Sequence, residues 1–219
     1  MTRGQNYYRD LLLALLALTL AYPLVSAWPA GRWIEQVAFV AVLITSTMAV
    51  YQRRYQLVLA GLVGLFLVIG GLINVLRAEP IGWLEASQVA TSLLFLSTVS
   101  YALGRDIFSS RGKVTAGLLY GAVSVYMLIG VTFASGHFLL ESLQPGSYQC
   151  GSPLCHGKPA IAAYVYFSFI TLSTVGYGEI LPATHLAATL AYAEATLGQM
   201  YTAILVARLV GMQITQARD

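Results

Sequence analysis

Residues 171–179 read TLSTVGYGE, and two glycines, Gly176 and Gly178, alternate with larger residues at the centre of this stretch. Glycine tolerates backbone angles that residues with a Cβ resist, so we expect a loop whose consecutive carbonyls point the same way. Such a row of oxygens, with the Thr174 hydroxyl at one end, can replace the water around a dehydrated cation. One chain supplies only one wall of a pore, so this interpretation requires an oligomer. The alternative is a glycine-rich turn between two membrane helices.

The composition places the chain among membrane proteins. Of its 219 residues, 58% are hydrophobic and only 10% are charged, and the mean hydropathy is +0.71. The net charge of +3 is too small to indicate a nucleic-acid partner. The sequence shows no nucleophile–base set, metal cluster or phosphate-binding loop, so we expect no enzymatic activity and no cofactor.

Six apolar runs are long enough to cross a bilayer as helices. They cover residues 11–28, 33–51, 57–76, 83–103, 114–140 and 186–210. A seventh apolar segment, residues 160–173, has a helical pattern but is too short to span, which favours a re-entrant helix leading into residues 174–178. The predicted fold is therefore an all-α membrane protein with six transmembrane helices and a re-entrant pore helix between helices five and six.

The distribution of Arg and Lys gives an independent prediction of topology. With the N-terminus inside, nine of the twelve basic residues fall on the inner side, namely Arg3, Arg9, Arg53, Arg54, Arg105, Arg111, Lys113, Arg208 and Arg218. Arg32, Arg77 and Lys158 fall outside. The positive-inside rule thus favours six spans in the cell membrane with both termini cytoplasmic. The same topology turns Tyr177 and Gly178 toward the outside and places Thr174 deeper.

Residues 114–210 resemble the pore module of tetrameric potassium channels, in which an outer helix, a turret, a pore helix, the signature TVGYG and an inner helix follow one another. The whole chain resembles six-helix prokaryotic channels, loosely over its first four helices. This resemblance implies a four-helix bundle at residues 1–113 and a pore domain at residues 114–219. The pore domain would comprise an outer helix at 114–140, a turret at 141–159, a pore helix at 160–173, a filter at 174–178 and an inner helix at 186–210.

The resemblance also implies a homotetramer in the lipid bilayer that conducts potassium passively. Its selectivity filter, which binds K⁺, would be Thr174, Val175, Gly176, Tyr177 and Gly178. The family most often has Asp where this chain has Glu179 at the outer mouth, and because the carboxylate is kept we expect little loss of selectivity.

Four residues of the predicted inner helix are candidates for further roles. Gly198 stands where the family has a bending glycine, although a helix glycine also simply permits close packing. Thr202 and Val206 share one face and are expected to line the cavity. Glu194 is the only carboxylate well inside a span, which is costly in lipid and suggests function. It would brace the pore helix or filter from behind, or be protonated.

The sequence indicates less about gating than about the filter. A voltage sensor needs several charges that move through the field. Residues 83–103 contain no Arg or Lys and only Glu85, so we expect weak or no intrinsic voltage dependence. The first four helices would then be a sensor-like bundle without its charges or a lipid-contacting scaffold. We also expect no ligand-gating domain in the nine residues after Val210.

Cys150 and Cys155 both fall outside by this topology, where oxidising conditions favour a disulfide. A bridge within the turret, a bridge between subunits and a metal site with His156 all stay open, the last lacking a fourth ligand. His137 and His185, near the outer ends of helices, are expected to be packing or surface residues.

Two other functions stay open. One is a subunit of a potassium uptake transporter, although those systems carry four degenerate repeats in one long chain and this chain has one. The other is a non-conducting regulatory subunit that keeps the pore fold.

Overall fold

The computed structural model describes residues 3–25, 31–50, 54–76, 82–109, 114–151 and 161–216. These residues form seven helices and two short strands. The helices are α1 (Arg3–Val25), α2 (Gly31–Val50), α3 (Arg54–Leu76), α4 (Gly82–Ser109), α5 (Ala116–Leu143), α6 (Ile161–Leu172) and α7 (His185–Gln216). The strands are β1 (Tyr148–Cys150) and β2 (Ile180–Pro182).

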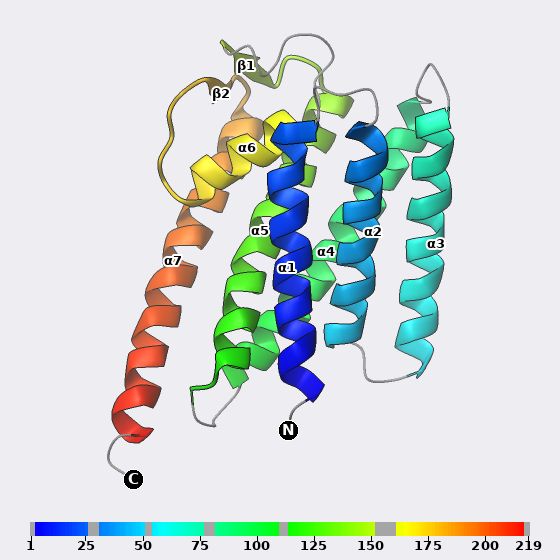
Figure 1. The fold of residues 1–219 in the computed structure, drawn as a ribbon. Coiled ribbons are helices and arrows are strands. Elements are labelled where there is room, and N and C mark those ends of the chain that lie inside the picture. The colour runs from blue at the N-terminus through cyan, green and yellow to red at the C-terminus, as the bar shows by residue number, and fades with distance from the viewer. Residues whose placement is uncertain are drawn as a thin grey trace.

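The six long helices, α1–α5 and α7, run alternately in opposite directions (Figure 1). The start of α1 and the end of α7 therefore lie at one end of the fold, and α6, β1 and β2 lie at the other. Helix α5 is central, because it packs against α1, α4, α6 and α7. The short helix α6 and the loop after it are thus held near one end of the bundle.

Among the described residues, three helices are long and apolar enough to cross a membrane, namely α4, α5 and α7. Shorter apolar segments occur at Val37–Ala49 in α2, at Gly61–Ile73 in α3 and at Ile161–Leu172 in α6. The fold is therefore mostly helical and consistent with an all-α membrane protein, whereas the six-span topology stays a prediction.

Three helices extend at their C-terminal ends beyond the apolar runs that predicted them. Helix α4 continues to Ser109 and so includes Arg105, which follows the predicted span of 83–103. Helix α5 ends at Leu143 rather than at residue 140, and α7 ends at Gln216 rather than at residue 210. Backbone hydrogen bonding continues past the last apolar residue, so hydropathy alone underestimates helix length.

The predicted all-α class also missed a short β-ladder. Strand β1 pairs with β2 in antiparallel fashion, with Tyr148 opposite Pro182 and Cys150 opposite Ile180. The turn before β1 is held by Glu141, whose carboxylate accepts the N–H groups of Gly146 (2.9 Å) and Tyr148 (3.1 Å). Gly146 has φ = +86°, which favours glycine. The ladder thereby ties the segment after α5 to the segment that follows residues 174–178.

Helix α7 is buried along one stripe only. Within the chain its buried residues are Ala187, Glu194, Gly198 and Tyr201. Large apolar side chains elsewhere on α7 are exposed, among them Leu186, Met200, Ile204, Val206 and Val210. A helix that is apolar around most of its circumference is stable only in an apolar environment or against other apolar surfaces.

Candidate functional site

The loop after α6 has an alternating backbone conformation. Positive φ angles occur at every second residue, at Thr174 (60°), Gly176 (55°) and Gly178 (94°). Reversing the sign of φ at alternate residues lets successive carbonyls face one side, whereas in an ordinary strand they alternate. The two glycines adopt this conformation without strain, but Thr174 has a Cβ and is strained there by about 1–3 kcal/mol. The sequence indicated the glycines and gave no sign of the left-handed Thr174.

The last turn of α6 holds the inner end of this loop through backbone amides. The N–H of Thr174 donates to Thr171 O at 2.9 Å, and those of Val175 and Gly176 donate to Ile170 O at 2.8 and 3.2 Å. Within the described part of the chain, no hydrogen bond engages the carbonyl oxygens of residues 174–178. All five residues are exposed. The loop therefore presents a row of backbone acceptors that still need partners.

Helix α7 contacts the inner end of the loop. Gln199 Nε2 donates to Thr174 Oγ1 at 3.0 Å. Thr202 and Val206, at i+3 and i+7 from Gln199, lie on the same face of α7 and are exposed. The structure thus brings these two predicted cavity residues beneath the predicted filter. Sequence reasoning missed Gln199, although its spacing from Thr202 and Val206 was visible.

Gly198 allows α7 to approach α6 closely. A Cβ at Gly198 would lie only 2.3 Å from Leu172 O, at the last residue of α6. Helix α7 is continuous through this position. Of the two interpretations of Gly198, close packing has a direct contact in the structure, and the hinge stays a prediction.

Glu179 lies where the loop leaves the site. Its Oε2 accepts a hydrogen bond from the Tyr166 hydroxyl of α6 at 3.2 Å. Its backbone oxygen accepts one from Gly151 N at 2.8 Å, which extends the contact between the two segments of the β-ladder. Glu179 is therefore held on both sides at the end of the loop opposite Thr174.

A buried polar cluster lies behind the loop, and Glu194 of α7 is at its centre. Glu194 and His137 of α5 are both fully buried, with Glu194 Oε2 2.8 Å from His137 Nε2. Glu194 Oε1 is hydrogen-bonded with Ser168 Oγ of α6. His137 Nδ1 lies 2.6 Å from the Tyr148 hydroxyl of β1. One carboxyl group thus joins α5, α6 and α7, and through His137 it reaches the β-ladder.

His137 was expected to be a packing or surface residue, and the structure places it in the interior as the partner of Glu194. Its ring packs edge-to-face against Tyr148 and Phe167. Tyr164 packs against Tyr148 in the same cluster. His185 is exposed at the start of α7. The pairing of His137 with Glu194, 57 residues apart, was invisible to local sequence patterns.

Counting protons in this cluster favours a neutral Glu194. Ser168 Oγ lies 2.6 Å from Gly130 O and also contacts Glu194, yet a hydroxyl has one proton to donate. All contacts become hydrogen bonds if Tyr148 donates to His137 Nδ1 and His137 Nε2–H donates to Glu194. A protonated Glu194 then donates to Ser168, and Ser168 donates to Gly130. This arrangement buries no net charge, which a low-dielectric interior favours.

The Tyr148 hydroxyl is the first donor in this series of hydrogen bonds. Burial raises the pKa of the Tyr148 phenol, and the nearby Tyr164 and Glu141 act in the same direction. Tyr148 therefore keeps its proton at neutral pH and can donate it to His137. Both sequence interpretations of Glu194, bracing and protonation, are compatible with this arrangement.

The structure leaves the predicted disulfide pairing undecided. Cys150 is disulfide-bonded, while Cys155 and His156 lie outside the described residues. Among the described residues no group of three or more His, Cys, Asp or Glu side chains is placed to hold a metal ion.

Comparison with known proteins gives a match over part of the chain. Residues 154–214 match a family model described as an ion channel. The matched segment includes α6, the loop at 174–178 and most of α7, and it covers less than half of the chain. No curated protein and no solved structure matches the chain. The match supports an ion channel, and thus a membrane transport protein rather than an enzyme.

The protonation of Glu194 predicts a difference between two substitutions. Gln has the shape of a protonated Glu and can accept from His137 and donate to Ser168, so Glu194→Gln should change the free energy of unfolding by less than about 1 kcal/mol. Glu194→Ala leaves buried partners unsatisfied and should destabilise the protein by about 1–3 kcal/mol for each of them. Thermal unfolding of the purified variants measures both. Equal damage from Gln and Ala would show that Glu194 acts as a carboxylate.

The close contact at Gly198 predicts that alanine substitutions at two glycines of α7 differ in their effect on stability. Gly198→Ala forces α7 away from Leu172 O and should destabilise the protein by about 1–3 kcal/mol. Gly211→Ala is the matched control, because a Cβ at Gly211 meets no atom within 4 Å. Alanine there should be neutral or stabilising by up to about 1 kcal/mol. Comparable melting temperatures for the two variants would contradict a packing role for Gly198.

Proposed function

We propose that the chain is a subunit of a homotetrameric potassium channel in which four copies of residues 174–178 surround one ion pathway. The supporting observation is the exposed loop with positive φ at alternate residues and carbonyl oxygens that have no partner among the described residues. Dehydrated K⁺ is stabilised by rings of such carbonyls, which replace its hydration shell. The match to an ion-channel family over residues 154–214 supports the same function.

The exposed surfaces of the single chain support assembly. Val175 and Tyr177 are 50% and 69% exposed, although they belong to a loop that must be rigid to select an ion. The exposed apolar side chains of Val206 and Val210 on α7 similarly lack cover. Packing of further copies around the loop would bury both surfaces, and a closed ring of identical subunits is the usual form of such an assembly.

The arrangement of charges supports the proposed topology. Arg54 begins α3, Arg105 lies near the end of α4, and Arg208 lies near the end of α7. These positions are at the end of the fold where α1 starts and α7 ends (Figure 1). With that end cytoplasmic, the positive-inside rule is satisfied for six spans in the cell membrane. The β-ladder and Glu179 then lie on the outer side.

Within this channel each part of the site has a proposed role. The carbonyls of Thr174, Val175, Gly176 and Tyr177 and the Thr174 hydroxyl bind K⁺, and Gln199 orients that hydroxyl. Thr202 and Val206 line the wider cavity below, toward which the C-terminal end of α6 directs its partial negative charge. Glu194 braces α6 from behind through Ser168. Selectivity for K⁺ over Na⁺ depends on holding these carbonyls at fixed positions.

The proposal predicts passive, selective flux from purified protein in liposomes. K⁺ should pass without ATP or a coupled ion, Na⁺ should hardly pass, and Ba²⁺ should block. Gly178→Ala should reduce K⁺ flux on the order of tenfold or more, because alanine is strained at φ = +94°. A Cβ at Gly178 meets nothing within 4 Å, so this loss would come from the backbone and not from a clash.

Gly64→Ala, a helix position where a Cβ also meets nothing within 4 Å, is the control and should conduct normally. Equal fluxes of K⁺ and Na⁺ would contradict the proposed filter. An absence of K⁺ flux at every pH, voltage and lipid composition tested would instead favour a non-conducting regulatory subunit.

We also propose that the channel has weak or no intrinsic voltage dependence. The described residues of α4 carry one basic side chain, Arg105, and it lies near the end of the helix. Steep gating needs several charges per subunit that cross the field. In planar bilayers the conductance–voltage relation should therefore be shallow. A steep relation with several gating charges per subunit would overturn this proposal.

A further inference from the structure

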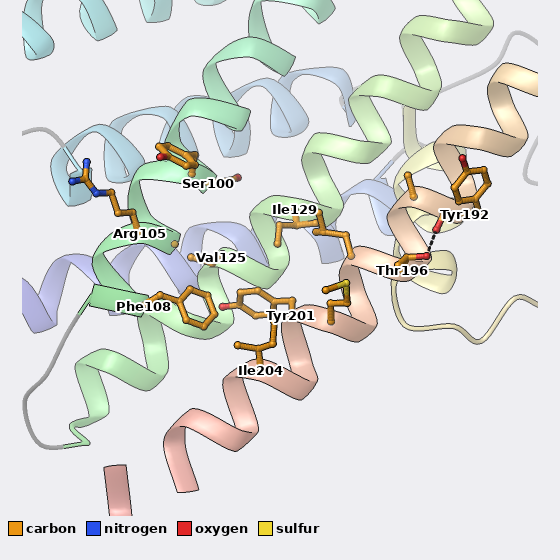
Figure 2. Close-up of a pocket in the computed structure, with 14 residues that line it drawn as sticks. Ser100, Arg105, Phe108, Val125, Ile129, Tyr192, Thr196, Tyr201 and Ile204 are labelled. Carbon is orange, nitrogen blue, oxygen red and sulfur yellow. Dashed lines mark hydrogen bonds between the residues drawn. The ribbon is translucent and has the colours of Figure 1, made fainter. Parts of the chain in front are cut away.

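Helices α4, α5 and α7 line an open cavity of about 630 Å³ that the conduction mechanism does not use. Figure 2 shows α4 and α7 as its two walls with α5 between them. Its lining is mostly apolar and includes Phe108, Ile129 and Leu197. A cavity of this size, between helices and rich in apolar side chains, is typical of a binding site for a small amphipathic molecule.

The cavity lies on the side of α7 that faces away from the proposed pore. Its α7 lining includes Ala193, Leu197, Met200 and Ile204, which form one stripe at helical spacing. Gln199 and the two cavity residues below the filter belong to a stripe on the opposite side of the helix. Further copies of the chain gather around the filter, so the position of this cavity favours lipid over a second copy as its occupant.

The dimensions of the cavity fit one leaflet of a bilayer. Its α7 lining runs from Tyr192 to Ile204, a rise of roughly 18 Å at 1.5 Å per residue. Half of the apolar core of a bilayer is about 15 Å. An acyl chain lying along α7 can therefore occupy the cavity over most of its length.

Two polar residues of α4, Arg105 and Ser100, lie at different positions along the length of the cavity. Arg105 lines one end, is exposed, and forms no ion pair with another described residue. Ser100 also lines the cavity, and its buried Oγ has no hydrogen-bond partner in the part of the chain that the structure describes. The two residues are roughly 7.5 Å apart along the helix. The Ser100 hydroxyl is buried as placed and would turn about χ1 into the cavity to donate to an ester oxygen next to a phosphate at Arg105.

Arg208, a second cation of the described residues near this end, is already engaged. Its guanidinium donates to Ile107 O and lies 5.5 Å from the centre of the Phe108 ring. Arg105 is therefore the cation of this cavity best placed to meet a ligand.

We propose that this cavity binds an anionic phospholipid of the cytoplasmic leaflet, with its phosphate at Arg105, an ester oxygen at Ser100 and one acyl chain along α7. The orientation rests on the proposed topology, which puts Arg105 at the cytoplasmic surface. Anionic lipids are concentrated in that leaflet, and basic pockets between membrane helices bind their headgroups. The lipid would fill the space between α4 and the helices α5 and α7. The first four helices would then contact the pore domain partly through this lipid.

The proposal is tested by native mass spectrometry of the full-length assembly after exchange into phosphatidylglycerol or phosphatidylcholine with identical acyl chains. The wild type should retain phosphatidylglycerol in preference to phosphatidylcholine. Arg105→Gln should reduce that preference on the order of fivefold, and Arg105→Lys should keep it. Ile129→Trp fills the cavity and should lose either lipid. Leu94→Trp, at a 69% exposed position of α4 outside the cavity, is its control and should bind as the wild type does.

If Ile129→Trp does not assemble, Leu197→Trp enters the same cavity from α7 and replaces it. The proposal is overturned if the wild type shows no headgroup preference. It is also overturned if the tryptophan variants bind as much lipid as the control. Dissociation of the assembly by both tryptophan variants, but not by the control, would indicate a second copy in the cavity and would overturn it as well. Because lipid binding is measured without ion flux, this result is independent of whether the protein conducts potassium.

Discussion

The buried contact of Glu194 with His137 and Ser168 is the interaction on which the rest of the site depends. It fixes the short helix α6, which has few other polar contacts to its neighbours, between α5 and α7. A carboxyl group in an apolar interior is stable only when its oxygens are paired, so loss of one partner affects all three helices. The neutral, directional chain of hydrogen bonds from Tyr148 to Gly130 satisfies this requirement without burying a charge. The position of the loop at residues 174–178 follows from the position of α6.

Contacts at both ends of the loop transmit this placement to it. At its inner end, Gly198 lets α7 meet Leu172 O, and Gln199 binds the Thr174 hydroxyl. At its outer end, the β-ladder and Tyr166 hold Glu179 and the residues after it. The loop is thus fixed at both ends, while its carbonyl oxygens have no hydrogen-bond partner among the residues that the structure describes. A selective ion site requires this combination of a rigid frame and available oxygens.

The sequence predicted what depends on local pattern and missed what depends on distant contacts. Apolar runs located the helices because hydropathy is a local property, and the two glycines located the loop because few other residues tolerate its backbone. The left-handed Thr174 was not predictable, since its strain is sustained by hydrogen bonds and packing from α6 and α7. The pairing of His137 with Glu194 and the β-ladder were missed for the same reason. Glu194 lies 57 residues from His137, and the partner of β1 lies beyond the loop at residues 174–178. Glu194 was identified by its cost in lipid, but its partners required the fold.

The central claim is that residues 174–178 of several copies form one K⁺ site. The most direct test is a structure of the purified full-length protein in lipid, determined once in K⁺ and once in Na⁺. The account predicts four copies around one axis, with ion density between the loops at the level of the carbonyls of Thr174 to Tyr177 in K⁺. A different number of subunits, or four loops that face lipid with no ion between them, would contradict it.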